Sequence, residues 1–310
     1  MAIESLPLPA VAAAKPAAGR SRRKLLRAVL TFYLPATIIA VLMLFPLFWM
    51  VSVSLRTNSQ IFTYPPAIVV WPPRWENYVD IWNDPRMQMG LQTWNTLIYA
   101  TVRTFLQLIF SAMAAFILAR FHFPGRNLVF YLVLATVMIP DEVMMVPLFL
   151  MVKSVPLAGG NDLFGAGGTG WLDTFYGLIL PGVISGYSIF FLRQFFLTLP
   201  KELEEAARID GCSELGIFWR VALPMCTPAL IALGIFSFQA AWSDFTWPLI
   251  ISGSPGTRTI QLGLGLMATT DGTDWSMLLT GAVLSTLPLI ALFVLLQRFI
   301  VTGVNFGVGK

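Results

Sequence analysis

Long stretches of this chain carry no charged side chain. Residues 28–55, 174–192, 221–243 and 275–297 are runs of 28, 19, 23 and 23 positions without Asp, Glu, Lys or Arg. A helix of about 20 apolar residues crosses the hydrocarbon core of a bilayer. Two more apolar stretches contain a few charges. The pattern therefore predicts an all-α polytopic membrane protein with six transmembrane helices, over residues 29–54, 93–119, 128–152, 174–196, 227–251 and 276–299.

Composition agrees with this prediction and narrows the chemistry. Of 310 residues, 56% are hydrophobic and 12% charged, whereas soluble domains carry about 25% charged residues. The net charge of +4 is too small to indicate a nucleic-acid binder. One histidine, His122, and two cysteines, Cys212 and Cys226, cannot form a metal site without relying on carboxylates. Since the chain also lacks a phosphate-binding G-x-x-x-x-G-K-[ST] loop, we expect no metal or cofactor here and any ATP hydrolysis on another chain.

The distribution of Lys and Arg predicts the orientation of the spans. One side of the membrane would hold fourteen of them and the other side five, with Arg103 inside a span. Because basic residues favour the cytosolic side, we expect both termini in the cytosol. Residues 1–27, which are rich in Ala and Pro and end in a basic cluster, are expected to be a disordered cytosolic tail before an uncleaved signal-anchor helix. Residues 28–310 would form the transmembrane domain, with outer loops over 55–92, 153–173 and 252–275.

The segment 200–226, between the fourth and fifth spans, predicts a short helix on the cytosolic face. Pro200 suits its first turn, and Gly211 suits a left-handed cap at its end. Its N-terminal half, where the helix dipole favours negative charge, holds Glu202, Glu204 and Glu205. The small residues Ala206 and Ala207 at its centre allow a partner surface to approach the backbone. From these residues alone, an ordinary solvated connector is an equally good interpretation.

The residue order in this segment resembles the EAA loop of binding-protein-dependent ABC importer permeases. Glu205-Ala206-Ala207 is followed after three residues by Gly211, after nine more by Val221, and after one more by Leu223-Pro224. Val221 departs from the family's usual isoleucine by a small volume. The resemblance implies a type I ABC importer permease fold and a coupling helix that seats in a cleft of an ATPase subunit. The docking residues it implies are Glu205, Ala206, Ala207, Asp210, Gly211, Leu223 and Pro224.

Motifs along the rest of the chain point to one subfamily. They include Asn95-Thr96-Leu97, Ala119-Arg120-Phe121, Met138-Ile139-Pro140, Arg193-Gln194-Phe195-Phe196 and Trp247-Pro248-Leu249-Ile250. They resemble the MalG-like carbohydrate-uptake permeases, which have a MetI-like transmembrane domain. This resemblance implies a transport subunit that is not an enzyme, in the cytoplasmic (inner) membrane of a bacterium or archaeon. It also implies a sugar, oligosaccharide or polyol as substrate. The implied partners are a second homologous permease subunit, two ATPase subunits that bind ATP and Mg, and an extracytoplasmic solute-binding protein.

Four ionisable residues fall inside the predicted spans, where charged groups are costly and often functional. Counting about 1.5 Å per residue from the cytosolic ends places all four at one depth in the outer half of the bilayer: Arg103, Asp141, Glu142 and Asp244. In one interpretation, Arg103 pairs with Asp141 or Glu142 and fixes helix packing. In the other, Asp244 lines the solute path with Gln239, Trp242, Ser243 and Trp247, because carboxylates and aromatic faces suit sugars.

Other functions have less support from the sequence. A self-contained secondary transporter of a small polar solute is the alternative, but it would normally show internal repeats and more than six spans. An intramembrane enzyme would need a nucleophile and a base in a recognisable arrangement. Pro140, Pro147 and Pro181-Gly182 predict kinks within spans, either static or acting as hinges.

Overall fold

The computed structural model describes residues 29–65, 67–268 and 272–305, with side-chain surroundings up to Gln297. Every regular element in these ranges is helical, which confirms the all-α prediction. The predicted tail, residues 1–27, and both chain ends lie outside the described residues. The chain forms two compact units, residues 1–51 and 52–310.

The described part of the first unit is a single apolar helical segment. It consists of η1 (Val29–Tyr33) and the greater part of α2 (Leu34–Ser54). The segment Val29–Ser54 has 26 residues, or about 39 Å at 1.5 Å per residue, enough to cross a bilayer. Its side chains are mostly exposed and apolar, as expected for a helix in contact with lipid.

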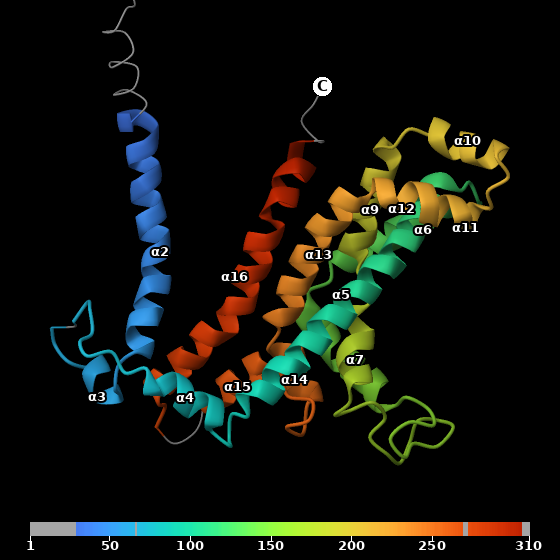
Figure 1. Ribbon diagram of the computed structural model, residues 1–310. Coiled ribbons are helices and arrows are strands. Elements are labelled where there is room, and N and C mark those ends of the chain that lie inside the picture. Colours follow the sequence, from blue (N-terminus) through green and yellow to red (C-terminus); the bar gives the residue numbers. More distant parts are fainter. Residues whose placement is uncertain (1–28, 66, 269–271, 306–310) are drawn as a thin grey trace, which may run out of the picture. The chain divides into compact units, whose positions relative to one another are not determined.

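The second unit begins at the last residues of α2 and contains all the remaining elements (Figure 1). Their bounds are α3 (Asn58–Ile61), α4 (Glu76–Asn83), α5 (Met89–Arg120), α6 (Arg126–Val137), α7 (Asp141–Lys153), α8 (Phe175–Ile179), η2 (Leu180–Gly182), α9 (Gly186–Thr198), α10 (Glu202–Ile209), α11 (Glu214–Ile217), η3 (Phe218–Ala222), α12 (Leu223–Met225), α13 (Thr227–Trp242), α14 (Thr246–Ile251), α15 (Ile260–Met267) and α16 (Trp275–Asn305). Within this unit, α10 and α11 lie at one end of α5, and α14 and α15 lie toward the other (Figure 1).

Three helices in the described chain are long and apolar enough to span a membrane singly, namely Val29–Ser54, α5 and the Trp275–Gln297 part of α16. Three bent pairs raise the number of candidate spans to six, in agreement with the predicted number. The pairs bend by 103° between α6 and α7, by 45° before α9 and by 76° before α13. Each bend lies near a proline: Pro140, Pro181 and Pro228. Proline removes a helical hydrogen bond and clashes with the preceding turn.

Two predicted spans differ from the structure. The predicted span over 128–152 is broken near Pro140, where a kink was expected, because α6 ends at Val137 and the chain turns by 103° before α7. The predicted span over 227–251 is divided, since α13 ends at Trp242 and α14 begins at Thr246. Short helices also form within two of the predicted outer loops, α4 within 55–92 and α15 within 252–275.

Helix α5 contributes to three separate hydrophobic cores. Near the α10 end, Phe116 packs edge-on against Phe196 of α9, with ring centroids 5.5 Å apart. Tyr99 is buried in the middle core and Met89 in the core near α15. Because α5 also packs along α9 and α13, it is the central helix of the second unit.

Candidate functional site

The predicted short helix exists as α10, Glu202–Ile209. It starts two residues after Pro200, so the proline precedes the first turn instead of occupying it. Its end matches the prediction, because Gly211 has a φ of 84°, in the left-handed region that favours glycine. The amide of Cys212 donates to the Ala207 carbonyl at 3.0 Å, and the amide of Asp210 donates to the Ala206 carbonyl at 3.0 Å. These bonds satisfy carbonyls that the helix end would otherwise leave without partners.

The two faces of α10 have different environments. Glu204 is buried on the inner face, and Ala207 is half-buried against the core that contains Phe116. The outer face is exposed and holds most of the residues predicted to dock a partner: Glu205, Ala206, Asp210 and Gly211. A Cβ added to Gly211 would meet no atom within 4 Å. The exposed surface therefore has small side chains at its centre and carboxylates at both ends.

The inner face is fixed by an ion pair that the sequence did not reveal. Arg120, at the end of α5, donates from Nε to Glu204 Oε1 at 2.7 Å, and the two side chains are 6% and 7% exposed. Arg120 Nη2 also donates to the Leu199 carbonyl at 3.0 Å. The partners are 84 positions apart, so no local sequence pattern indicates the contact.

The remainder of the predicted coupling loop folds back onto this core. Arg208 forms two hydrogen bonds with Glu214, at 2.7 and 2.9 Å, and this interaction raises the pKa of Arg208 above its ordinary value. Leu223 is half-buried against the same core as Ala207, whereas Pro224 is exposed. Cys226 is a buried free thiol.

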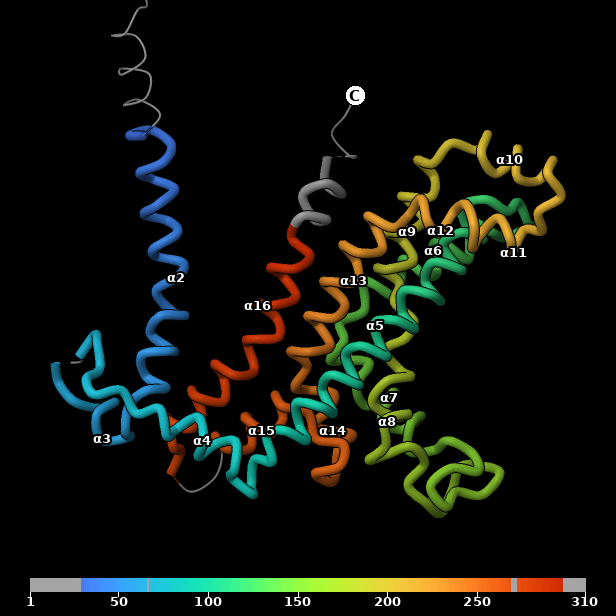
Figure 2. The backbone as a smooth tube through the Cα atoms, in the orientation of Figure 1, coloured from blue at the N-terminus to red at the C-terminus, as the bar shows by residue number. Residues whose placement is uncertain are grey.

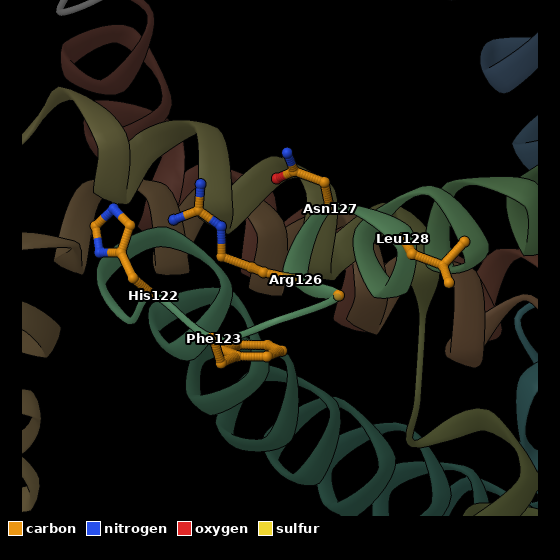
Figure 3. A pocket seen from close by; sticks show the side chains of 6 residues that line it. His122, Phe123, Arg126, Asn127 and Leu128 are labelled. Carbon is orange, nitrogen blue, oxygen red and sulfur yellow. The ribbon is translucent and has the colours of Figure 1, made fainter.

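A shallow pocket of about 240 Å³ lies at the turn between α5 and α6. Figure 3 shows the imidazole of His122 and the guanidinium of Arg126 on the same side of this turn. Arg126 Nη1 donates to the Phe121 carbonyl at 3.3 Å. The pocket is lined by exposed or half-buried side chains of one short segment. The lining begins two residues after Arg120, and none of the predicted site residues belongs to it.

The intramembrane charges pair differently from the prediction. Arg103 Nη1 lies 3.2 Å from Asp244 Oδ2, and their side chains are 24% and 19% exposed. The Tyr99 hydroxyl donates to the same carboxylate oxygen at 2.7 Å and accepts a short hydrogen bond from Arg103. The expected pairing of Arg103 with Asp141 or Glu142 is wrong. Both acids are exposed in the first turn of α7, beyond the 103° bend, and neither forms an ion pair with a described residue.

The break between α13 and α14 positions Asp244. Its second carboxylate oxygen accepts the amide of Trp247 at 3.2 Å. The Trp247 indole donates to the Gly177 carbonyl at 3.1 Å, which ties α14 to α8. Gly182 leaves room for the Arg103 side chain, since a Cβ at this position would overlap the guanidinium. Asp244 therefore joins three helical segments at one point.

The other predicted path residues are divided between the surface and the core. Gln239 and Ser243 are exposed at the end of α13. Trp242 is buried, stacks on Phe238 with ring centroids 5.7 Å apart, and donates its indole N–H to the Ser285 carbonyl of α16 at 3.0 Å. Among the described residues, no group of three or more His, Cys, Asp or Glu side chains is placed to hold a metal ion.

Comparison with known proteins agrees with this architecture. A family described as "Binding-protein-dependent transport system inner membrane component" matches residues 107–305. The chain is 33% identical over 273 residues to the arabinooligosaccharides transport system permease protein AraQ of Halalkalibacterium halodurans, with 87% of this chain and 92% of that protein covered. It is 32% identical over 268 residues to the sn-glycerol-3-phosphate transport system permease protein UgpE of Yersinia enterocolitica, with 84% and 90% covered.

A solved structure has a similar fold. It is a bacterial ABC transporter involved in the import of the acidic polysaccharide alginate, with a TM-score of 0.71 at 20% identity over 92% of this chain and 99% of that chain. The family match covers more than half of this sequence, and both relatives are aligned over most of their length. This chain belongs to the family of inner membrane components of binding-protein-dependent transport systems.

Proposed function

We propose that the chain is one permease subunit of an ATP-driven importer that moves a carbohydrate, delivered by an extracytoplasmic binding protein, into the cytosol. A second homologous permease subunit would complete the pore, and two separate ATPase subunits would bind ATP and Mg. The relatives named for arabinooligosaccharide and sn-glycerol-3-phosphate transport support a polyhydroxylated substrate. Residues 28–310 would form the permease domain, after a cytosolic tail over residues 1–27.

The observation that carries this proposal is the asymmetry of α10. Its inner face is held by a buried ion pair, while the outer face leaves Glu205, Ala206 and Gly211 exposed. A solvated connector needs no such fixed inner face. A fixed helix with small residues at its exposed centre suits a complementary cleft on an ATPase, which can approach the backbone closely. A self-contained secondary transporter would have no use for this surface.

The proposed orientation places α10 and both chain ends in the cytosol of a bacterium or archaeon. Arg120 and Arg126 lie at the α10 end of α5, and Lys201 and Arg208 lie in or beside α10. Basic residues at this end support a cytosolic face under the positive-inside rule. The loops near α14 and α15 would then face the binding protein.

We further propose that Asp244 lines the solute path with its exposed neighbours Gln239 and Ser243, and that Trp242 and Trp247 support this lining. Two exposed polar side chains beside a half-buried carboxylate, at the end of an otherwise apolar helix, support this assignment. Hydroxyl groups of a carbohydrate could donate to the carboxylate and exchange hydrogen bonds with the amide.

Purification of the complex tests the proposal. The full chain, purified from the membrane of its native host, should co-purify with an ATPase and a second permease subunit. Glu205→Ala should weaken ATPase binding while α10 stays folded. Glu202→Ala, on the same helix, should leave ATPase binding unchanged. Transport by the purified chain alone, or normal ATPase binding by Glu205→Ala, would contradict the assignment.

A further inference from the structure

The Arg120–Glu204 pair joins α10 directly to the end of α5. Its N–O distance is 2.7 Å, and the same guanidinium also donates to the Leu199 carbonyl, in the turn between α9 and α10. One side chain of α5 therefore holds both the helix α10 and the connection that leads into it. Arg120 Nη1 is buried and has no hydrogen-bond partner among the described residues, so the arginine depends on Glu204 for its charge compensation.

Burial makes this contact different from the other ion pair of the same segment. Separating the partners of a buried pair leaves uncompensated charges in a low-dielectric environment, so we expect the pair to stay intact when α10 is displaced. The Arg208–Glu214 pair has the same N–O distance of 2.7 Å, but its side chains are 49% and 43% exposed. Water and salt screen that exposed pair, which therefore restrains motion weakly.

Helix α5 is suited to carry a displacement from one end to the other. It is a continuous helix of 32 residues without an internal proline, whereas three other candidate spans bend by 45°, 76° and 103°. Figure 2 shows α5 running from the α15 end of the second unit to the α10 and α11 end. Arg103 lies seventeen residues before Arg120, a distance of about 25 Å along the helix axis.

These contacts place two ion pairs on one continuous helix. Arg120 binds Glu204 of α10, and Arg103 binds Asp244 at the break between α13 and α14. We propose that Arg120 and Glu204 are positioning residues that transmit motion of α10 through α5 to Asp244, and so couple ATPase movement to the solute path. This inference rests on the proposed function of α10 as the ATPase-docking helix.

The test uses the purified complex in liposomes and measures uptake, ATP hydrolysis and subunit association. Glu204→Gln leaves the exposed docking residues unchanged, so the ATPase should still bind and hydrolyse ATP. Uptake per ATP hydrolysed should fall about tenfold or more because the buried arginine loses its ionic partner. The charge swap R120E/E204R should recover part of the uptake per ATP hydrolysed. Glu214→Gln, in the exposed pair, serves as the matched control and should keep the wild-type ratio.

A second variant separates transmission by the ion pair from simple packing. R120M/E204L removes both charges and keeps the buried volume, a replacement that usually preserves folding. Its complex should assemble with unchanged thermal stability and remain uncoupled. Wild-type uptake per ATP in either E204Q or R120M/E204L would overturn the inference. Failure of the unmodified chain to bind an ATPase would instead overturn the proposed function.

Discussion

The carboxylate of Asp244 lies 3.2 Å from the guanidinium of Arg103, across 141 positions of sequence. Tyr99 completes the cluster by donating to Asp244 and accepting from Arg103. The same carboxylate is thus a packing element and a candidate contact for the solute, and substitutions can separate the two roles.

Asp244→Leu should lower stability and transport together. The leucine leaves Arg103 without its ionic partner, which we expect to cost up to about 3 kcal/mol because the pair is mostly buried. R103M/D244L removes both charges and should restore the melting temperature of the complex. If Asp244 contacts the solute, uptake by this double variant stays low. Normal uptake would restrict Asp244 to a packing role.

Tyr99→Phe should destabilise the second unit without changing the charges. The variant removes one hydroxyl that bonds to both Arg103 and Asp244, and we expect a loss of about 1–2 kcal/mol in the free energy of unfolding. Tyr176→Phe is the matched control because Tyr176 is exposed in α8. Chemical denaturation in detergent measures both. Equal stability of the two variants would show that the Tyr99 hydroxyl adds nothing to the cluster.

The sequence predicted most of the elements but not their long-range pairing. Charge-free runs identified the spans because lipid tolerates few charged side chains. Gly211 marked the end of α10 because a left-handed cap favours glycine. The expected partners of Arg103 on the neighbouring span, however, rest on a uniform rise of about 1.5 Å per residue along that span. The 103° bend after α6 removes Asp141 and Glu142 from that position.

The same limitation applies to Arg120 and Glu204. The sequence places Glu204 in a cytosolic helix and Arg120 in a family motif, but a contact across 84 positions depends on how α5, α9 and η3 pack. Local periodicity determines where helices form and carries no information on such packing. The short α15 was missed because its eight residues are too few to span a membrane.

Stability of the loop after α14 should decrease at acidic pH. Asp173 accepts hydrogen bonds from Gly253 and Ser254 at 3.0 Å and from the Thr257 hydroxyl. Burial alone raises the pKa of Asp173, but these hydrogen bonds outweigh burial and lower the pKa below its ordinary value. The folded state therefore gains stability above the unfolded pKa, and this gain disappears as pH falls through the lowered folded pKa.

Hydrogen exchange of residues 252–258 measures this effect. Protection should be constant near neutral pH and fall below about pH 4, the ordinary range of aspartate. Asp173→Asn should show weaker protection at neutral pH and little change on acidification, while Asp80→Asn, in an exposed pair, should behave like the wild type. Retention of the acid-dependent loss in Asp173→Asn would assign it to another group.

Phe116→Ala should strongly destabilise the α10 end of the second unit. Phe116 is buried and packs against Phe196 and Phe218, with ring centroids 5.5 and 5.3 Å away. Loss of this ring leaves a cavity, and we expect a cost of about 3–5 kcal/mol. Phe105 lies on the same helix with an exposed side chain, so Phe105→Ala should change the free energy of unfolding by less than about 0.5 kcal/mol if only lipid covers it. A large effect of Phe105→Ala, confined to the assembled complex, would instead place that face of α5 against another subunit.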